Sequence, residues 1–198
     1  MSDDDSLVHD AALSPMRPSD PPAEYPRELE RWVDLPGGER MFLRPIVPED
    51  VARIGNAFEH ADIDTIRRRF FTAAPPTDRA HLEYLARVDY VRRLALVAMD
   101  ADGDSVGIGR YETTDDGRAE VAIVVAPAWR RLGVATVLLQ ALEAPAISHG
   151  IEVFHALYLP DNTSVEKLLI GLGYGDRRVV DGIIELVKPL ADAGTIAE

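Results

Sequence analysis

Three apolar runs separated by Asp-Gly dipeptides lie in the middle of the 198-residue chain, and they restrict its fold more than any other feature. The runs are RRLALVAMD at 92–100, DSVGIGRYETT at 104–114 and RAEVAIVV at 118–125, with Asp102-Gly103 and Asp116-Gly117 between them. An Asp-Gly pair between such runs is the strongest short-range signal of a β-hairpin. The pattern therefore predicts three consecutive antiparallel strands.

The sequence on both sides of these strands predicts further strands and helices. Before them we expect strands at 31–35 and 40–46, then helices at 47–60, 62–71 and 77–88, the last capped by Thr77 or Asp78. After them we expect a long helix, a strand at 151–159, a short helix at 162–175 and a hairpin at 177–190. This order predicts one α/β (α+β) domain over residues 29–190, with a mixed, mostly antiparallel sheet flanked by helices.

Residues 1–28 and 191–198 lack the apolar periodicity of this domain. The N-terminal segment is acidic and rich in proline, so we expect a disordered tail that is dispensable for activity, and the last eight residues form a second short tail. The chain contains no cysteine, no signal peptide and no membrane-spanning run, which favours a cytoplasmic location. Its net charge of −13 argues against nucleic acid or an anionic membrane as a partner.

The long helix after the third run has an unusual beginning. Its apolar residues recur at helical spacing from Val134 to Leu142, and we expect it to run from about residue 130 to Gly150, with a kink or an end at Pro145. A helix usually opens on a Ser, Thr, Asp or Asn side chain that accepts from a free backbone N–H. This one opens on RRLG at 130–133, which offers no such acceptor.

An uncapped helix N-terminus after a strand is a favourable anion site, because its dipole and its free N–H groups both face outward. Gly133 allows a ligand to approach the backbone closely, and Arg130 and Arg131 add positive charge. We therefore expect a phosphate-bearing ligand to cap this helix. Water and the Thr136 hydroxyl are the alternative partners of these N–H groups.

Arg130-x-x-Gly133-x-Ala135 resembles the (Q/R)-x-x-G-x-(G/A) signature of the GNAT superfamily of acyl-CoA-dependent N-acetyltransferases. Asn162, followed by a short helix and Gly173-Tyr174, resembles the second signature of that family. The resemblance covers about residues 38–188 and implies acetyl-CoA as co-substrate, with its pantetheine arm along the strand and its pyrophosphate on the loop amides. The residues that it assigns to acetyl-CoA are Ile123, Val124, Val125, Arg130, Arg131, Gly133, Val134, Ala135, Thr136 and Asn162.

A narrower similarity joins RRRFF at 67–71, HLEYLARVDY at 81–90 and LPDNTSVEKLLIGLGY at 159–174. Together these segments look like the catalytic domain of bacterial Pat-type protein-lysine acetyltransferases, which implies a protein lysine as the acceptor. Some Pat-type enzymes also carry a cyclic-nucleotide domain or an acyl-CoA-synthetase-like domain, and these 198 residues hold neither. Taken alone, the arginines of RRRFF could bind an anion, but such a run is more typical of a solvated helix face.

Acetylation of an amine requires a base, because a lysine ammonium with a pKa of about 10.4 must lose a proton before it can attack. Glu120 is the only charged residue between Ala119 and Val125, and the resemblance to Pat-type enzymes implies that it is the general base. Glu112 and His155 are reserve candidates. Many family members use a tyrosine as general acid where this chain has Leu169, which leaves Tyr158 or water for that role.

Two other functions compete with this hypothesis. One is N-acetylation of a small amine or an antibiotic, and the other is a non-catalytic acyl-CoA sensor, against which the presence of Glu120 argues. We expect no metal, because DADGD at 100–104 lacks the later residues of a calcium loop and the five histidines show no ligand spacing. The sequence leaves the oligomeric state open.

Overall fold

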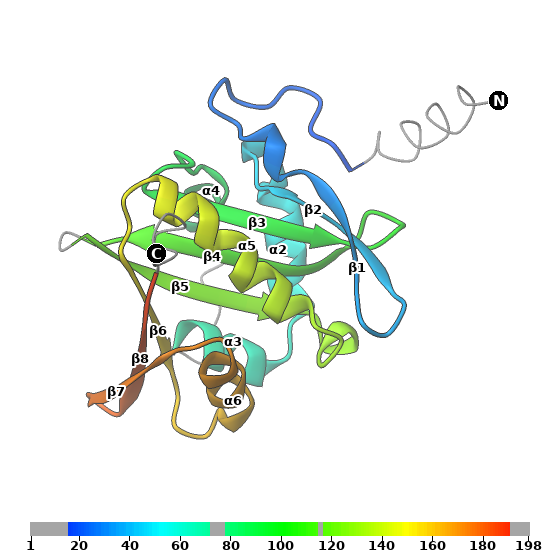
Figure 1. The fold of residues 1–198 in the computed structure, drawn as a ribbon. Helices are drawn as coiled ribbons and strands as arrows, with labels where there is room; N and C mark the ends of the chain where they lie inside the picture. The colour runs from blue at the N-terminus through cyan, green and yellow to red at the C-terminus, as the bar shows by residue number, and fades with distance from the viewer. Residues whose placement is uncertain (1–15, 72–77, 115–116, 191–198) are drawn as a thin grey trace.

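An eight-stranded sheet with the order β1-β2-β3-β4-β5-β6-β8-β7 forms the centre of the molecule (Figure 1). The structure, a computed structural model, describes residues 16–71, 78–114 and 117–190. Every neighbouring pair of strands is antiparallel except β5 and β6, which are parallel. The strands are β1 (Arg31–Asp34), β2 (Arg40–Pro45), β3 (Arg93–Met99), β4 (Ser105–Thr113), β5 (Arg118–Val125), β6 (Val153–Tyr158), β7 (Gly175–Val180) and β8 (Ile183–Pro189).

Helices cover both faces of the sheet. The helices are α2 (Val51–Glu59), α3 (Ile63–Phe70), α4 (Arg79–Ala86), α5 (Val134–Ser148) and α6 (Thr163–Gly171), with single 3₁₀ turns η1 (Arg27–Leu29), η2 (Pro48–Asp50) and η3 (Pro127–Trp129). In Figure 1, α5 crosses one face of β3, β4 and β5, and α2 lies behind them. Gly107 and Gly109 bring α5 close to β4, because a Cβ on either residue would lie within 3.2 Å of Val134 or Leu138.

The predicted fold class is confirmed, and so is the meander of three antiparallel strands. Gly103 adopts a φ of +85°, which a turn between β3 and β4 requires and glycine supplies without strain. The second turn includes Asp116, which lies outside the described residues. Asp78, one of the two predicted caps of α4, accepts from the His81 N–H at 3.0 Å, whereas Thr77 also lies outside the described residues.

One expectation about α5 is wrong, and one half of a second is wrong as well. The helix begins at Val134, four residues later than predicted, because Arg131 and Gly133 have φ values of 64° and 101° and so lie outside the helical region. Of the kink or end predicted at Pro145, the end is wrong, because the helix continues to Ser148, close to the predicted limit at Gly150. Proline removes one N–H donor there, which weakens the helix. The last turn nevertheless forms, because Leu142 and Ala146 are fully buried and their packing stabilises it.

The segment before β1 differs from the expected tail over residues 16–28. Met16 is only 2% exposed and packs near Phe42, and its carbonyl accepts from Arg44 Nε at 2.6 Å. Tyr25 is buried against Tyr90 with ring centroids 5.8 Å apart. Proline content therefore did not prevent this segment from docking on the domain, because three anchors fix it. Residues 1–15 and 191–198 lie outside the described residues.

A buried ion pair stabilises the junction between this segment, β2 and η2. Arg44 and Asp50 are 3% and 4% exposed, and two hydrogen bonds of 2.7 and 2.8 Å join the guanidinium to the carboxylate. Burial alone would raise the pKa of Asp50, but the hydrogen bonds and charge of Arg44 hold it below its ordinary value.

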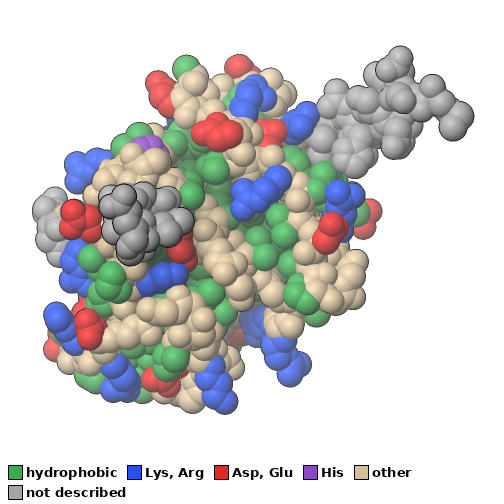
Figure 2. Space-filling model, viewed as in Figure 1, with side chains coloured by type: hydrophobic (Ala, Val, Ile, Leu, Met, Phe, Trp, Pro, Cys, Tyr) green, Lys and Arg blue, Asp and Glu red, His purple; other side chains and the backbone are tan. Residues whose placement is uncertain are grey.

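On the surface, Figure 2 shows acidic and basic side chains interspersed over the visible face.

Candidate active site

The site begins where β5 and β6 separate. The two strands pair from Arg118 to Val121 on β5 and from Val153 to Ala156 on β6, whereas β5 continues to Val125 along its other neighbour, β4. The edge of β5 from residue 122 onward therefore has no strand partner on the β6 side within the described chain. A cavity of about 680 Å³ lies along this open edge. An unpaired strand edge offers N–H and C=O groups to an extended ligand.

The N-terminus of α5 forms one end of this cavity. No side chain caps the helix, and Val137 donates the first helical hydrogen bond, to the Gly133 carbonyl at 3.1 Å. The free N–H groups and the helix dipole together favour an anion, as the sequence predicts. Gly133 has a second reason to be glycine, because its φ is +101° and a Cβ there would lie 3.3 Å from Pro36.

The structure brings the predicted site residues together around this cavity, with one exception. The predicted residues that line it are Glu120, Ile123, Val124, Val125, Arg130, Arg131, Gly133, Ala135, Thr136 and Asn162. Val134 does not line it, because its side chain is 1% exposed and packs into the core under α5. Its backbone N–H, in the first turn of α5, is the only group through which the predicted role of Val134 can operate.

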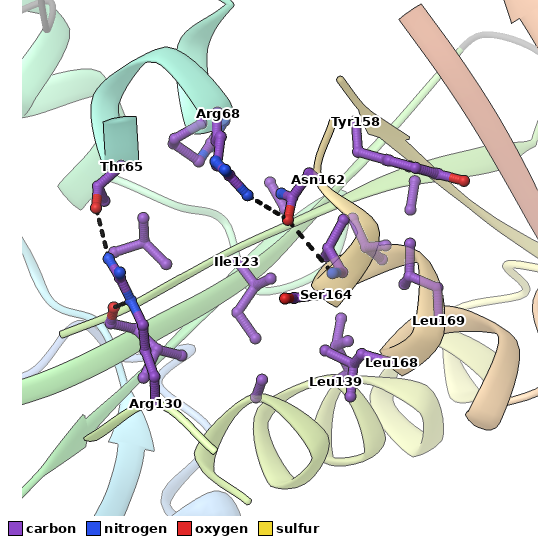
Figure 3. A pocket seen from close by; sticks show the side chains of 18 of the residues that line it. Thr65, Arg68, Ile123, Arg130, Leu139, Tyr158, Asn162, Ser164, Leu168 and Leu169 are labelled. Atoms are coloured by element: carbon purple, nitrogen blue, oxygen red, sulfur yellow. Dashed lines mark hydrogen bonds between the residues drawn. The ribbon is translucent and has the colours of Figure 1, made fainter. Parts of the chain in front are cut away.

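Arg130 is already engaged by α3. Its guanidinium donates to the Thr65 hydroxyl at 2.6 Å and lies 3.4 Å from Asp62, which caps α3 (Figure 3). No local pattern predicts this contact, because Thr65 and Arg130 are far apart in the chain. These contacts hold Arg130 beside the start of α5, where we expect the phosphate to bind.

Asn162 connects α3 to α6 at another part of the cavity wall. Its Oδ1 atom accepts from the Val165 N–H at 3.3 Å and from Arg68 Nη1 at 2.8 Å (Figure 3). Arg67, the preceding residue of α3, is ion-paired with Asp161. Arg67 and Arg68 of α3 thus contact the two residues that precede α6. The sequence analysis did not predict this role for the RRRFF run.

Glu120 lines the cavity at its inner end, where β5 still pairs with β6. In the sheet register it lies opposite Glu112 on β4 and opposite His155 on β6, so these three side chains share one face. Glu112 accepts a hydrogen bond from Tyr84, and His155 Nδ1 lies 3.2 Å from Glu185. Neither reserve candidate lines the main cavity, and Glu120 is therefore the best-placed carboxylate.

The hydroxyl of Tyr158 is engaged by a residue of α6. It lines the cavity (Figure 3), but its hydroxyl donates to Glu166 at 3.0 Å. Burial, and then the neighbouring Glu166 carboxylate, raise the pKa of Tyr158. Leu169, at the position of the tyrosine found in many family members, lines the same wall. Water therefore remains the better of the two candidate acids.

No metal centre emerges from the described residues, which contain no group of three or more His, Cys, Asp or Glu side chains arranged to hold an ion. The DADGD loop is held instead by Asp100 Oδ1, which accepts from the N–H groups of Asp102 and Asp104. None of the described helices is both long enough and apolar enough to span a membrane.

Comparison with known proteins agrees with this geometry. Residues 60–174 match the acetyltransferase (GNAT) family. The chain is 35% identical over 144 residues to acetyltransferase Pat of Mycolicibacterium smegmatis, an alignment that covers 71% of this chain and 43% of Pat. An acetyltransferase of Pseudomonas aeruginosa is 27% identical over 169 residues, covering 83% of this chain and 91% of that protein. The crystal structure of the GNAT domain of S. lividans PAT superposes with a TM-score of 0.77 at 30% identity, covering 84% of this chain and 100% of that domain.

The chain belongs to the GNAT family of acetyltransferases, which use acetyl-CoA as the acetyl donor. It is similar to Pat acetyltransferases both in sequence and in fold. It spans less than half the length of the Mycolicibacterium protein, but the whole of the GNAT domain from S. lividans.

Proposed function

We propose that this GNAT acetyltransferase moves an acetyl group from acetyl-CoA to the side-chain amine of a protein lysine, with Glu120 as general base. The observation that carries the proposal is the arrangement of three features along one cavity. These are the uncapped N-terminus of α5, the open edge of β5, and the Glu120 carboxylate at the inner end. From Val125 to Glu120 the strand advances about 16 Å, at roughly 3.3 Å per residue.

In this arrangement the pyrophosphate of acetyl-CoA would bind the free N–H groups at the start of α5, with Arg130 beside them. The amide groups of the pantetheine arm would pair with the edge of β5 at Ile123 to Val125, as another strand would. Ten of the eleven predicted site residues line the cavity that this placement requires.

The chemistry assigned to Glu120 is removal of one proton. A neutral amine attacks the thioester carbonyl, the new C–N bond forms, and the C–S bond breaks with departure of the CoA thiolate. Glu120 accepts the proton that the lysine ammonium must lose before this attack, either directly or through one water. The second proton, which the nitrogen loses as the amide forms, passes through water to the thiolate. Water can return a proton to the thiolate, which has a reference pKa of about 8.5 and so leaves without a strong acid.

The choice of a protein lysine rests on the similarity to Pat acetyltransferases in sequence and in fold, which covers 71% and 84% of this chain. The experiment is incubation of the full chain with isotope-labelled acetyl-CoA and cell extract, followed by mass spectrometry of intact proteins, tryptic peptides and small molecules. Label on lysine side chains supports the proposal. Label only on polyamines or aminoglycosides would make the chain a small-amine acetyltransferase, and binding of acetyl-CoA without turnover would make it a sensor.

A further inference from the structure

Arg69, the third arginine of α3, lies in the same cavity as Glu120 but has none of the partners of its neighbours. Arg67 and Arg68 each form ion pairs with Asp64 and contact the beginning of α6. Arg69, by contrast, has one ring contact, with its guanidinium carbon 4.9 Å from the centroid of the Phe70 ring. Among the described residues it forms no hydrogen bond or ion pair. Its five N–H donors are therefore available at the inner end of the cavity.

A buried guanidinium, that of Arg110, lies close to Arg69. Arg110 on β4 is 7% exposed, and its Nη2 atom has no hydrogen-bond partner within the described chain. The nearest carboxylate oxygen, from Glu112, is 4.0 Å from that atom. Arg69 and Arg110 share the wall of a small void of about 30 Å³, large enough for one water between them. A buried donor without a partner is costly, so an acceptor group that reaches Arg110 Nη2 would be favourable, while the half-buried Arg69 presents its own donors to the cavity.

The charges around Glu120 indicate which acceptor group that is. Burial and the adjacent Arg110 lower the pKa of Arg69 to about 10, while Glu120 and Glu112 oppose this shift. Arg69 and Arg110 therefore face the carboxylates of Glu120 and Glu112, and Arg93 adds a further positive charge next to Arg110. An incoming lysine ammonium adds one more positive charge to a site that already holds these guanidiniums, and like charges repel. A carboxylate arriving on the same acceptor would offset that charge and accept from the free donors.

We propose that Arg69, backed by Arg110, binds an acidic side chain next to the lysine that is acetylated, so that the enzyme selects lysines flanked by Asp or Glu. A guanidinium fork matches a carboxylate with two parallel hydrogen bonds, which gives the contact its specificity. The cavity that holds Arg69 also holds Glu120, so one acceptor segment reaches both. This inference rests on the proposed function, because it assumes that the acceptor is a lysine in a polypeptide.

The test uses the full chain, acetyl-CoA and two peptides that differ only in having Asp or Asn beside their single lysine. Asn has the shape of Asp without its charge. Steady-state kinetics should give the Asp peptide a kcat/KM about 10-fold or more above that of the Asn peptide, the usual effect of a charge-assisted hydrogen bond, expressed mainly in KM.

Three variants identify the residue responsible. Arg69→Gln should bring the Asp-to-Asn ratio close to one, and Arg69→Glu should favour a third peptide with Arg beside the lysine. Arg69→Lys keeps the charge without the fork and should give an intermediate ratio. Arg79→Gln is the matched control, because Arg79 lies on the exposed side of α4, paired with Glu83 at 2.7 Å, and should leave the ratio unchanged.

Equal kcat/KM for the two peptides, or a preference that survives Arg69→Gln with the fold intact by circular dichroism, would overturn the inference. Failure of the proposed function has a different signature. In that case no lysine peptide is acetylated while a polyamine is, and the inference fails with it.

Discussion

Arg68 donates to Asn162 Oδ1 at 2.8 Å, so the residue that caps α6 is tied by the same oxygen atom to α3. This contact uses the acceptor of the Asn162 amide. Its Nδ2 donors form no hydrogen bond within the part of the chain that the structure describes. The capping role and the predicted role in acetyl-CoA binding therefore depend on different atoms of one side chain, and they can be separated.

Asn162→Asp should keep the cap and the contact with Arg68 but lose the two amide donors. We expect unchanged or slightly higher stability, since an acidic residue suits a helix N-terminus, together with CoA affinity about 10-fold weaker. Asn162→Ala should lose about 1 kcal/mol of stability as well. Thermal unfolding and calorimetry measure the two effects. If the Asp variant binds CoA as wild type does, Asn162 is only a cap.

Ala135 offers a cleaner test of the anion site than Gly133, whose positive φ makes any substitution strained. Ala135 lies in the first turn of α5 and lines the cavity. Ala135→Glu should leave helix stability intact, because a carboxylate there interacts favourably with the dipole. It should weaken CoA binding at least 10-fold more than the neutral control Ala135→Gln, measured by calorimetry at low salt. Equal losses in the two variants would mean that the phosphate binds elsewhere.

The docked segment 16–28 should contribute to stability. A chain beginning at Leu29 loses Met16 and Tyr25, two almost fully buried side chains. At about 1.5–3 kcal/mol for each side chain, we expect a decrease of about 3 kcal/mol or more in the free energy of unfolding. Urea denaturation of this chain, compared with one beginning at Met16, measures the decrease. Identical midpoints would show that the segment does not stabilise the domain.

The Arg44–Asp50 pair should make stability depend on pH. Asp50 has a lowered pKa in the folded state, so its contribution is complete above its unfolded value of about 3.9 and disappears as pH falls through the folded value. Asp50→Asn should destabilise the fold by about 3 kcal/mol at neutral pH, because it leaves a buried guanidinium unpaired. It should also flatten the stability profile below pH 4. The control Glu49→Gln, at an exposed neighbour, should change neither; a profile for Asp50→Asn parallel to that of wild type would contradict this account.

The elements that local chemistry determines could be predicted from the sequence. Asp-Gly turns predicted the meander, and the uncapped start of α5 indicated the anion site. The later start of α5 could not be predicted, because positive φ at a non-glycine residue, Arg131, leaves no trace in an apolar pattern. Nor could the continuation past Pro145, which depends on packing against the sheet.

The contacts of α3 could not be predicted from local sequence patterns, for a different reason. Arg68–Asn162 and Arg130–Thr65 join residues 94 and 65 positions apart in the chain, so no spacing rule reaches them. A run of three arginines on a short helix is typical of a solvated face, and only the tertiary structure shows that each faces the cavity or the helix beside it. The N-terminal segment likewise docks through distant contacts, those of the buried Met16 and Tyr25, although its composition predicts disorder.

The central claim is that Glu120 takes the proton from the acceptor amine, and the most direct measurement is the turnover of Glu120→Gln. Glutamine keeps the shape and removes proton acceptance. With a lysine substrate, kcat should fall about 10²–10⁴-fold while CoA affinity by calorimetry stays at the wild-type value, and the rising limb of the pH–rate profile should disappear. The control Glu152→Gln, at an exposed glutamate outside the cavity, should turn over as wild type does. A Glu120→Gln enzyme as active as wild type would contradict the mechanism, and loss of activity in Glu112→Gln instead would move the base to the neighbouring strand.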